Sequence, residues 1–212
     1  MATCRTPPVT GRARNHARGT IWARNGEAVT ASRLEPATTS QFTVDNERMP
    51  LHDPATLPEA FDAAASCLKL VVLVSPTCPI CLDGVGVVRD SLAELDSAHV
   101  SVYVLWVPVL KGDTPEAAQD SARLFGSTVR AVHYWDDDRA LSSRYCDLLG
   151  LKERGRSVAW DLYLIYDKGT RWSAGPPMPK VWMQQLLLDD VPELEQTALV
   201  SQLRQRLEKT DP

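Results

Sequence analysis

Residues 69–95 read KLVVLVSPTCPICLDGVGVVRDSLAEL, and three local patterns in this stretch decide the fold. Residues 69–74 form a nearly continuous aliphatic run, which is typical of a strand buried on both faces of a sheet. Residues 83–95 repeat their apolar side chains at helical spacing, which predicts an amphipathic helix. A CxxC motif at residues 78–81 separates the two, so the stretch predicts a buried strand, a cysteine pair and a helix in direct succession.

The position of the CxxC motif favours redox chemistry. Pro79 suits the first turn of a helix, where its missing N–H costs no hydrogen bond, and this places Cys78 at the mouth of the helix. Unpaired backbone N–H groups and the positive end of the helix dipole stabilise a thiolate there. We therefore expect Cys78 to be the attacking sulfur, and Cys81, one turn further in, to resolve the mixed disulfide. A buried, unreactive cysteine pair is the alternative.

The rest of the chain alternates short apolar runs with helical patterns, as α/β domains do. The expected helices lie at residues 57–68, 83–95, 114–125, 139–149 and 193–209. The expected strands lie at residues 69–74, 100–107, 129–135 and 159–166. A turn at residues 167–169 predicts an antiparallel hairpin partner at residues 170–172. Residues 181–188 follow three prolines and fit either a helix or a loop.

This order of elements, with CxxC between the first strand and its helix, resembles the thioredoxin-like fold. It is most similar to the version found in TlpA-like thiol–disulfide oxidoreductases and peroxiredoxin relatives, over residues 57–172 and the C-terminal helix. The resemblance implies a central mixed sheet flanked by helices, with Cys78 as the nucleophilic thiol and Cys81 as the resolving thiol. It also implies no organic cofactor and no resident metal, and a partner that is a protein dithiol or disulfide or a small thiol.

The residues before the first cysteine depart from the family pattern. Many members have Trp there, whereas this chain has Ser75, Pro76 and Thr77. An aromatic platform for partner docking is therefore missing or supplied elsewhere, which argues against ordinary coupling to thioredoxin reductase. A peroxidase would need Thr and Pro ahead of its reactive cysteine and a separate Arg. Pro76 and Thr77 stand in reversed and compressed order, and the sequence assigns no such Arg.

A second departure concerns the cis-proline that normally faces the CxxC motif at the start of the fourth strand. Alignment of the turn at Gly169 with the family's hairpin glycine places Asp161 at that position. We therefore expect Asp161 to lie near Cys78 and Cys81, where a carboxylate disfavours a neighbouring thiolate and can accept the proton of Cys81. A solvated residue at the start of the strand is the alternative.

Two other classes of function stay open. In a metal-handling protein, Cys78 and Cys81 would bind Cu(I), Hg(II) or Zn(II), because soft thiolates suit these ions and the shielding proline is missing. A closed zinc site needs four ligands, and the chain has a single CxxC motif. In a redox-silent binding module, the two cysteines would neither oxidise nor react with an alkylating agent near neutral pH.

The remaining candidates favour structural roles. His133, in an apolar strand, is expected to be a hydrogen-bonded core or surface residue and is the one reserve ligand. The acidic run at residues 136–138 fits a solvated turn in which Asp138 caps the next helix. Cys67 and Cys146 are expected to pack as small hydrophobes on helices. Core or rim packing is expected of the tryptophans in or beside strands, which are Trp106, Trp135, Trp160 and Trp172.

Composition and charge set the outer limits. The 212 residues are 44% hydrophobic and carry a formal net charge of −4, which indicates one ordinary globular domain. Residues 1–48 hold seven Arg, no Lys and four acidic residues, a net charge of +3, whereas residues 49–212 carry −7. Residues 1–48 also lack a periodic apolar pattern. We expect a disordered tail there, with a transit peptide or translated upstream sequence as alternatives, and the thioredoxin-like domain at residues 49–212.

The same arithmetic argues against several classes of protein. Mild acidity gives no sign of a nucleic-acid partner, and no apolar stretch approaches the roughly 20 residues of a membrane helix. Five cysteines are too few, and odd in number, for a disulfide scaffold. Residues 1–30 contain no apolar run typical of a secretory signal, which favours a cytoplasmic location.

Overall fold

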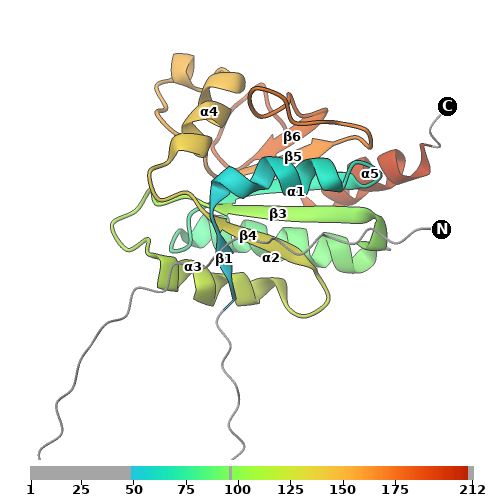
Figure 1. Cartoon of the computed structure of the whole chain (residues 1–212), viewed down its shortest axis with the longest axis horizontal. Coiled ribbons are helices and arrows are strands. Elements are labelled where there is room, and N and C mark those ends of the chain that lie inside the picture. The colour runs from blue at the N-terminus through green and yellow to red at the C-terminus, as the bar shows by residue number, and fades with distance from the viewer. Residues whose placement is uncertain (1–48, 96, 210–212) are drawn as a thin grey trace, which may run out of the picture. The chain divides into compact units, whose positions relative to one another are not determined.

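The computed structural model describes residues 49–95 and 97–209, in which six strands form one mixed sheet with helices on both faces (Figure 1). In sheet order the strands are β1 Leu51–His52, β4 Ala131–Trp135, β3 Val100–Trp106, β2 Leu68–Val74, β5 Leu162–Tyr166 and β6 Val181–Gln184. β1, β4, β3 and β2 pair in parallel, and β5 and β6 pair antiparallel to their neighbours. The predicted α/β class and thioredoxin-like architecture are confirmed. The predicted tail at residues 1–48 lies outside the described residues.

The helices bury two separate cores against the two faces of the sheet. They are α1 Leu57–Ala63, α2 Pro79–Glu94, α3 Pro115–Ala122, α4 Ala140–Leu148 and α5 Gln196–Glu208, with short 3-10 helices η1 Pro54–Thr56, η2 Ser97–His99, η3 Arg123–Phe125 and η4 Lys152–Arg154. The alternate residues Leu70 and Val72 of β2 pack with α2, α3 and α5, whereas Val71 and Leu73 pack with α1 and α4. Figure 1 shows α1 and α2 on opposite faces of the sheet. Because β2 is buried on both faces, its sequence is the nearly continuous apolar run that precedes the CxxC motif.

The predicted hairpin partner of the fourth strand is wrong. Residues 170–172 form no strand, because the backbone N–H of Trp172 donates to the Asp62 carboxylate at 2.7 Å instead of to a neighbouring strand. The partner is β6, which begins after the three prolines that cannot donate to a ladder. The segment left open between helix and loop therefore starts as a strand, and the connection between β5 and β6 is longer than a tight turn.

The antiparallel pairing of β5 with β2 brings two distant parts of the sequence together. Leu162 pairs with Leu73, so Asp161, one residue earlier, lies beside the end of β2, where the CxxC loop begins. Gln184 pairs with Leu162 on the other side, so Gln185 follows beside Asp161. One end of the sheet thus carries the CxxC loop, the start of β5 and the end of β6. None of the described helices combines the length and the apolar character that a membrane crossing requires.

Candidate active site

Cys78 lies at the point where β2 has ended and α2 begins. Its backbone is extended, with φ −81° and ψ 117°, and its carbonyl accepts the N–H of Leu82 at 3.0 Å, the first hydrogen bond of the helix. Pro79 occupies the first helical position, as predicted, and the Cys78 side chain makes no capping hydrogen bond. The first backbone N–H groups of α2 therefore keep their donating capacity close to the sulfur of Cys78.

The two cysteines differ in how they meet solvent. Cys78 is 6% exposed and Cys81 is fully buried, and neither is in a disulfide. Cys81 lies within hydrogen-bonding reach of the Cys78 side chain and of the Ser75 backbone. Burial raises the pKa of Cys81 far above its ordinary value, and the nearby Asp161 charge raises it further. Cys81 is thus held as a neutral thiol behind Cys78.

Asp161 lies close to Cys81, at the position where the resemblance would place a cis-proline. The described residues contain no cis peptide bond, and Asp161 has φ 57°, in the left-handed region. Proline holds φ near −65°, so it cannot adopt this backbone, whereas Asp is among the few residues that tolerate it. The carboxyl group is buried and close enough to Cys81 to interact with its thiol, and burial raises the pKa of Asp161. The alternative of a solvated residue at the strand start is wrong.

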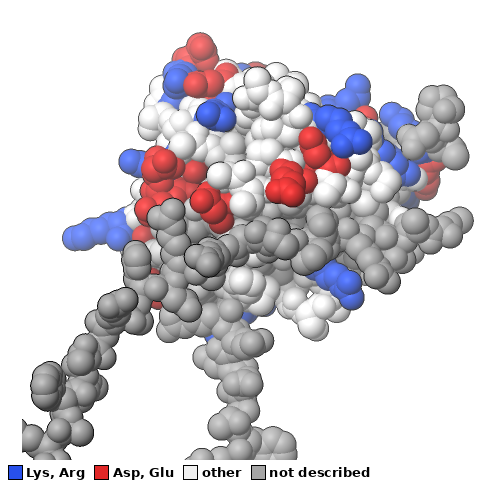
Figure 2. Space-filling view, in the orientation of Figure 1, with Lys and Arg blue, Asp and Glu red and all other residues white. Residues whose placement is uncertain are grey.

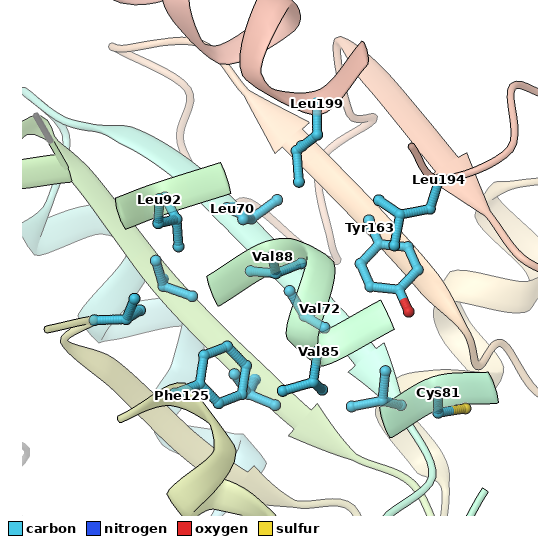
Figure 3. Packing of buried hydrophobic residues seen from close by; sticks show 14 of the residues in the cluster. Leu70, Val72, Cys81, Val85, Val88, Leu92, Phe125, Tyr163, Leu194 and Leu199 are labelled. Atoms are coloured by element: carbon cyan, nitrogen blue, oxygen red, sulfur yellow. The ribbon is translucent and has the colours of Figure 1, made fainter. Parts of the chain in front are cut away.

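Tyr163 and Gln185 complete the surroundings of the Asp161 carboxylate. The Tyr163 hydroxyl donates to Asp161 Oδ1 at 2.9 Å. The Gln185 side-chain amide satisfies its neighbours when its nitrogen faces them, donating to Tyr163 Oη at 2.8 Å, Asp161 Oδ1 at 3.0 Å and the Ile80 carbonyl at 3.2 Å. Figure 3 shows the Tyr163 hydroxyl directed toward the start of α2, where Cys81 lies. A buried acid and two neutral donors therefore lie directly behind the cysteine pair.

Asp113, in the loop after β3, fixes the segment that precedes Cys78. Its carboxylate accepts the Ser75 hydroxyl at 2.9 Å, the Thr77 hydroxyl at 2.6 Å and the Thr77 backbone N–H at 3.2 Å. The same carboxylate accepts the backbone N–H groups of Val109 and Leu110 at 2.8 and 2.7 Å. One side chain thus joins the loop before α2 to the loop after β3. Nothing in the sequence pattern indicates this tether, since Asp113 looks like an ordinary loop residue.

The surface beside the cysteines is partly apolar. Ile80, inside the motif, is 54% exposed, and Trp160, directly before Asp161, is half-buried. None of the three residues directly before Cys78 is aromatic. Trp160 is instead an aromatic residue directly before Asp161, on the other side of the site.

The reserve ligand His133 is a core residue. It is buried, its Nδ1 accepts the indole N–H of Trp106 at 3.2 Å, and its ring stacks on Trp106. Burial lowers the pKa of His133 to about 4, so the imidazole is neutral at pH 7. The predicted hydrogen-bonded core role is confirmed.

The acidic run after β4 is only partly the solvated turn that the sequence predicts. Asp138 is exposed and accepts the Ala140 N–H at 2.9 Å, but Asp136 is buried and accepts the N–H groups of Leu141 and Ser142 at 3.2 and 2.7 Å. Asp136 is therefore the main carboxylate at the start of α4. The run turns inward because three free N–H groups at that helix start need acceptors.

Two further cysteines of the described residues are away from the motif and buried. Cys146 lies in α4, where its thiol donates to the Arg156 carbonyl at 3.3 Å. Cys67 lies between α1 and β2 and not on a helix, which corrects its predicted position. Trp106 is fully buried, and Trp135, Trp160 and Trp172 are half-buried, as core and rim packing predict.

Possible metal ligands are scattered over the described residues, and charges of both signs share the visible surface (Figure 2). Among residues 49–95 and 97–209, no group of three or more His, Cys, Asp or Glu side chains is arranged to hold a metal ion. On the face shown in Figure 2, the Lys and Arg residues drawn in blue lie interspersed with acidic residues. Cofactors, nucleic-acid partners and location stay predictions.

Comparison with known proteins gives only distant structural neighbours. No family model and no curated protein matches the chain. A secreted Mycobacterium tuberculosis disulfide oxidoreductase homologous to E. coli DsbE aligns at 14% identity and TM-score 0.45, over 68% of this chain and 87% of its own. A thioredoxin-like protein in the oxidised form aligns at 15% identity and TM-score 0.45, over 69% and 81%. MTB dsbF aligns at 14% identity and TM-score 0.39, over 66% and 81%.

The fold is therefore assigned from this chain's own topology. β2, the CxxC motif, α2, β3, α3, β4, α4, β5, β6 and α5 follow one another in the order that the resemblance predicts. The cysteine pair lies at the end of β2 and the start of α2, beside the start of the antiparallel strand β5. This strand order and this location of Cys78 and Cys81 give the chain a thioredoxin-like fold.

Proposed function

We propose that this protein is a thiol–disulfide oxidoreductase that exchanges its Cys78/Cys81 dithiol with a protein disulfide or a small disulfide. One observation carries the proposal: Cys78 begins a helix, and Cys81 lies behind it in hydrogen-bonding reach of both Cys78 and the buried Asp161 carboxyl group. This arrangement gives one sulfur a helix dipole, a second sulfur a line of attack on the first, and a base for the second sulfur's proton.

The reaction proceeds in two exchanges. The Cys78 thiolate attacks one sulfur of the partner disulfide, which forms a mixed disulfide and releases the partner's other sulfur as a thiolate that takes a proton from water. Cys81 then transfers its proton to the Asp161 carboxylate and attacks Cys78. The Cys78–Cys81 disulfide forms, and the second partner thiolate leaves. The protein loses two electrons and the partner gains two; the reverse sequence oxidises a partner dithiol.

Partner docking uses the rim of the site. Ile80 exposes an apolar side chain within the motif, and Trp160 offers an aromatic surface next to Asp161. These side chains suit contacts with the residues that flank a cysteine in a polypeptide, so a protein dithiol or disulfide is favoured over a small thiol.

Single-cysteine variants test this function in the full chain. Cys81→Ser should trap a stable mixed disulfide with a disulfide-containing peptide, because the resolving sulfur is gone, whereas Cys78→Ser should form none. Cys146→Ser, which removes a buried thiol elsewhere, should exchange like the wild type. Mass spectrometry under non-reducing conditions reads all three outcomes.

A redox-buffer series measures the couple itself. The wild type should show a reversible two-electron couple; a potential near or below about −270 mV indicates a reductant and one above about −180 mV an oxidant or isomerase. A cysteine pair that neither oxidises nor alkylates, or that binds Cu(I) tightly without a reversible couple, would overturn the proposal in favour of a binding module or a soft-metal protein.

A further inference from the structure

We propose that Tyr163 and Gln185 are positioning residues, which hold the Asp161 carboxylate against Cys81 so that it accepts the resolving proton. This inference rests on the proposed function and assigns to β5 and β6 a part in it that the CxxC motif does not contain. Neither side chain has a polar atom that reacts with the partner. Both act through Asp161.

Hydrogen bonds to a single carboxylate oxygen carry the inference. Tyr163 Oη and the Gln185 amide nitrogen both donate to Asp161 Oδ1, at 2.9 and 3.0 Å, and Gln185 also donates to Tyr163 Oη at 2.8 Å. The backbone adds a further contact, since the Gln185 N–H donates to the Asp161 carbonyl at 3.3 Å. The three residues form a closed set in which each is fixed by the other two. Cys81 is a further group that interacts with this carboxyl group.

Gln185 also joins this set to the CxxC motif. Its amide nitrogen reaches the Ile80 carbonyl at 3.2 Å. Gln185, which directly follows β6, is therefore hydrogen-bonded to the residue before Cys81. The distance between the acid and the thiol is therefore set by a contact that spans α2, β5 and β6. A displacement of any of these elements changes how the proton is passed.

Gly84 provides the space that the arrangement needs. A Cβ at Gly84 would overlap the Tyr163 hydroxyl and the Gln185 side-chain amide, whereas a Cβ at Gly86 would meet nothing within 4 Å. Glycine lowers helix stability by up to about 1 kcal/mol relative to alanine, so an interior glycine on the packed face of α2 is retained at a cost. The cost is explained by the approach of Tyr163 to the helix.

The charged and titratable groups that face Asp161 make its ionisation depend on these two donors. Cys81 faces it from α2, Tyr163 faces it from β5, and Arg156 acts on it from the loop after η4. The Arg156 guanidinium donates to the Leu186 carbonyl at 3.2 Å, and the structure gives it no ion pair with Asp161. Burial raises the pKa of Asp161, and the Tyr163 hydrogen bond lowers it. Without that donor, less of the carboxylate is ionised at neutral pH and less of it can accept a proton.

The test separates attack from resolution. With 5,5′-dithiobis(2-nitrobenzoate) as the disulfide, attack by Cys78 releases one thionitrobenzoate and resolution by Cys81 releases a second, so the slower optical phase reports resolution. The rate of this phase should fall at low pH as Asp161 becomes protonated. Tyr163→Phe should move the midpoint of that fall up by about one pH unit, so that resolution slows about tenfold on the acid side.

Matched variants distinguish positioning from general damage. Tyr103→Phe removes another buried hydroxyl, one that donates to the Ala60 carbonyl at 2.9 Å on the other face of the sheet, and should leave the midpoint unchanged. Gly84→Ala should reproduce the upward shift by displacing Tyr163, whereas Gly86→Ala, the same change two residues away, should not. Gln185→Leu should shift the midpoint in the same direction, and it keeps the test valid if Tyr163→Phe fails to fold.

The outcomes separate this inference from the proposed function. An unshifted midpoint in both Tyr163→Phe and Gln185→Leu overturns the positioning role, while loss of the acid-side fall in Asp161→Asn upholds Asp161 as the proton acceptor. If the resolution rate of Asp161→Asn has the same pH dependence as that of the wild type, Asp161 is not the proton acceptor. In that case Tyr163 and Gln185 have no positioning role either.

Discussion

At the scale of single residues, Asp113 is the side chain on which the Cys78 loop depends most. Its carboxylate accepts hydrogen bonds from the Ser75 and Thr77 side chains and from three backbone N–H groups. Asp113→Asn replaces one acceptor oxygen by a donor that faces these donors. We expect the free energy of unfolding to fall by about 2–3 kcal/mol, measured by urea denaturation, because donors bonded to a charged group lose their partner.

Asp120→Asn is the matched control. Asp120 is exposed on α3 and faces Arg123 at 3.8 Å, the geometry of a weak surface ion pair. Its loss should change the free energy of unfolding by less than about 0.5 kcal/mol. Equal effects of the two substitutions would show that Asp113 is not a structural tether.

His133 makes stability depend on pH in a predictable direction. In the folded chain burial lowers its pKa to about 4, whereas the unfolded chain has the ordinary value near 6.5, so the unfolded chain binds the extra proton between these pH values. The stability from neutral His133 is complete above pH 6.5 and is lost as pH falls toward 4. At about pH 4.5 the loss should reach about 2.5 kcal/mol. Urea denaturation of the wild type and of His133→Gln, above pH 6.5 and at about pH 4.5, measures this loss.

His52 lies on β1 beside Tyr134, the residue after His133, and burial also lowers the pKa of His52, so it adds to the same trend. For that reason the measured quantity is the difference between wild type and variant. If His133→Gln loses as much stability between neutral and acidic pH as the wild type, the buried imidazole does not carry the effect.

Residue-scale prediction from sequence worked where chain geometry fixed the answer. Asp161 was placed near the cysteines by aligning the turn at Gly169 with the hairpin glycine of the family that the chain resembles, and the placement agrees with β5, which runs antiparallel to β2 and begins beside the end of β2. Gly84 carried a usable signal, since a glycine inside an apolar helical pattern indicates a close approach. Asp113 carried none, because a loop carboxylate that receives distant donors looks like any solvated acid. Roles for Cys78, Cys81 and Asp161 in catalysis stay predictions.

At the scale of elements, the start of α4 depends on a buried acid. Asp136 accepts the N–H groups of Leu141 and Ser142, and it follows β4 directly. Asp136→Ala removes both acceptors from a buried helix start and should lower the free energy of unfolding by about 1–2 kcal/mol in urea denaturation. Asp138→Ala removes one exposed acceptor and should cost less. A larger effect of Asp138→Ala would return the capping role to the residue that the sequence favoured.

The order of elements was predictable because it rests on strong local patterns. The unbroken apolar runs of β2 and β3 reflect burial on both faces. The prediction at residues 170–172 was wrong because a turn pattern indicates where the chain reverses. It does not indicate which later segment pairs with the preceding strand. β1 was missed because two residues are too short to show any period, and its pairing with β4 is set by tertiary structure.

At the scale of the whole molecule, the site lies where the two cores meet the end of the sheet. Cys78, Cys81 and Tyr163 belong to the core between the sheet and α2, and Leu162 belongs to the core on the opposite face, between the sheet and α4. Asp161, between these cores, is therefore buried on all sides and has no cation within ion-pair distance among the described residues. A buried acid of this kind lowers the stability of the fold.

Asp161→Asn should make the whole protein more stable at neutral pH while it slows resolution. Burial raises the pKa of Asp161 in the folded chain above its unfolded value, so the folded chain binds the extra proton and wild-type stability falls as pH rises through the folded pKa. Asn is isosteric, tolerates the positive φ of this position and can still accept from Tyr163 and Gln185. The gap in melting temperature between Asp161→Asn and wild type should therefore widen with rising pH. A variant less stable than wild type in alkaline buffer would mean that the ionised carboxylate stabilises the fold, and Asp161 would then be a structural acceptor rather than a strained base.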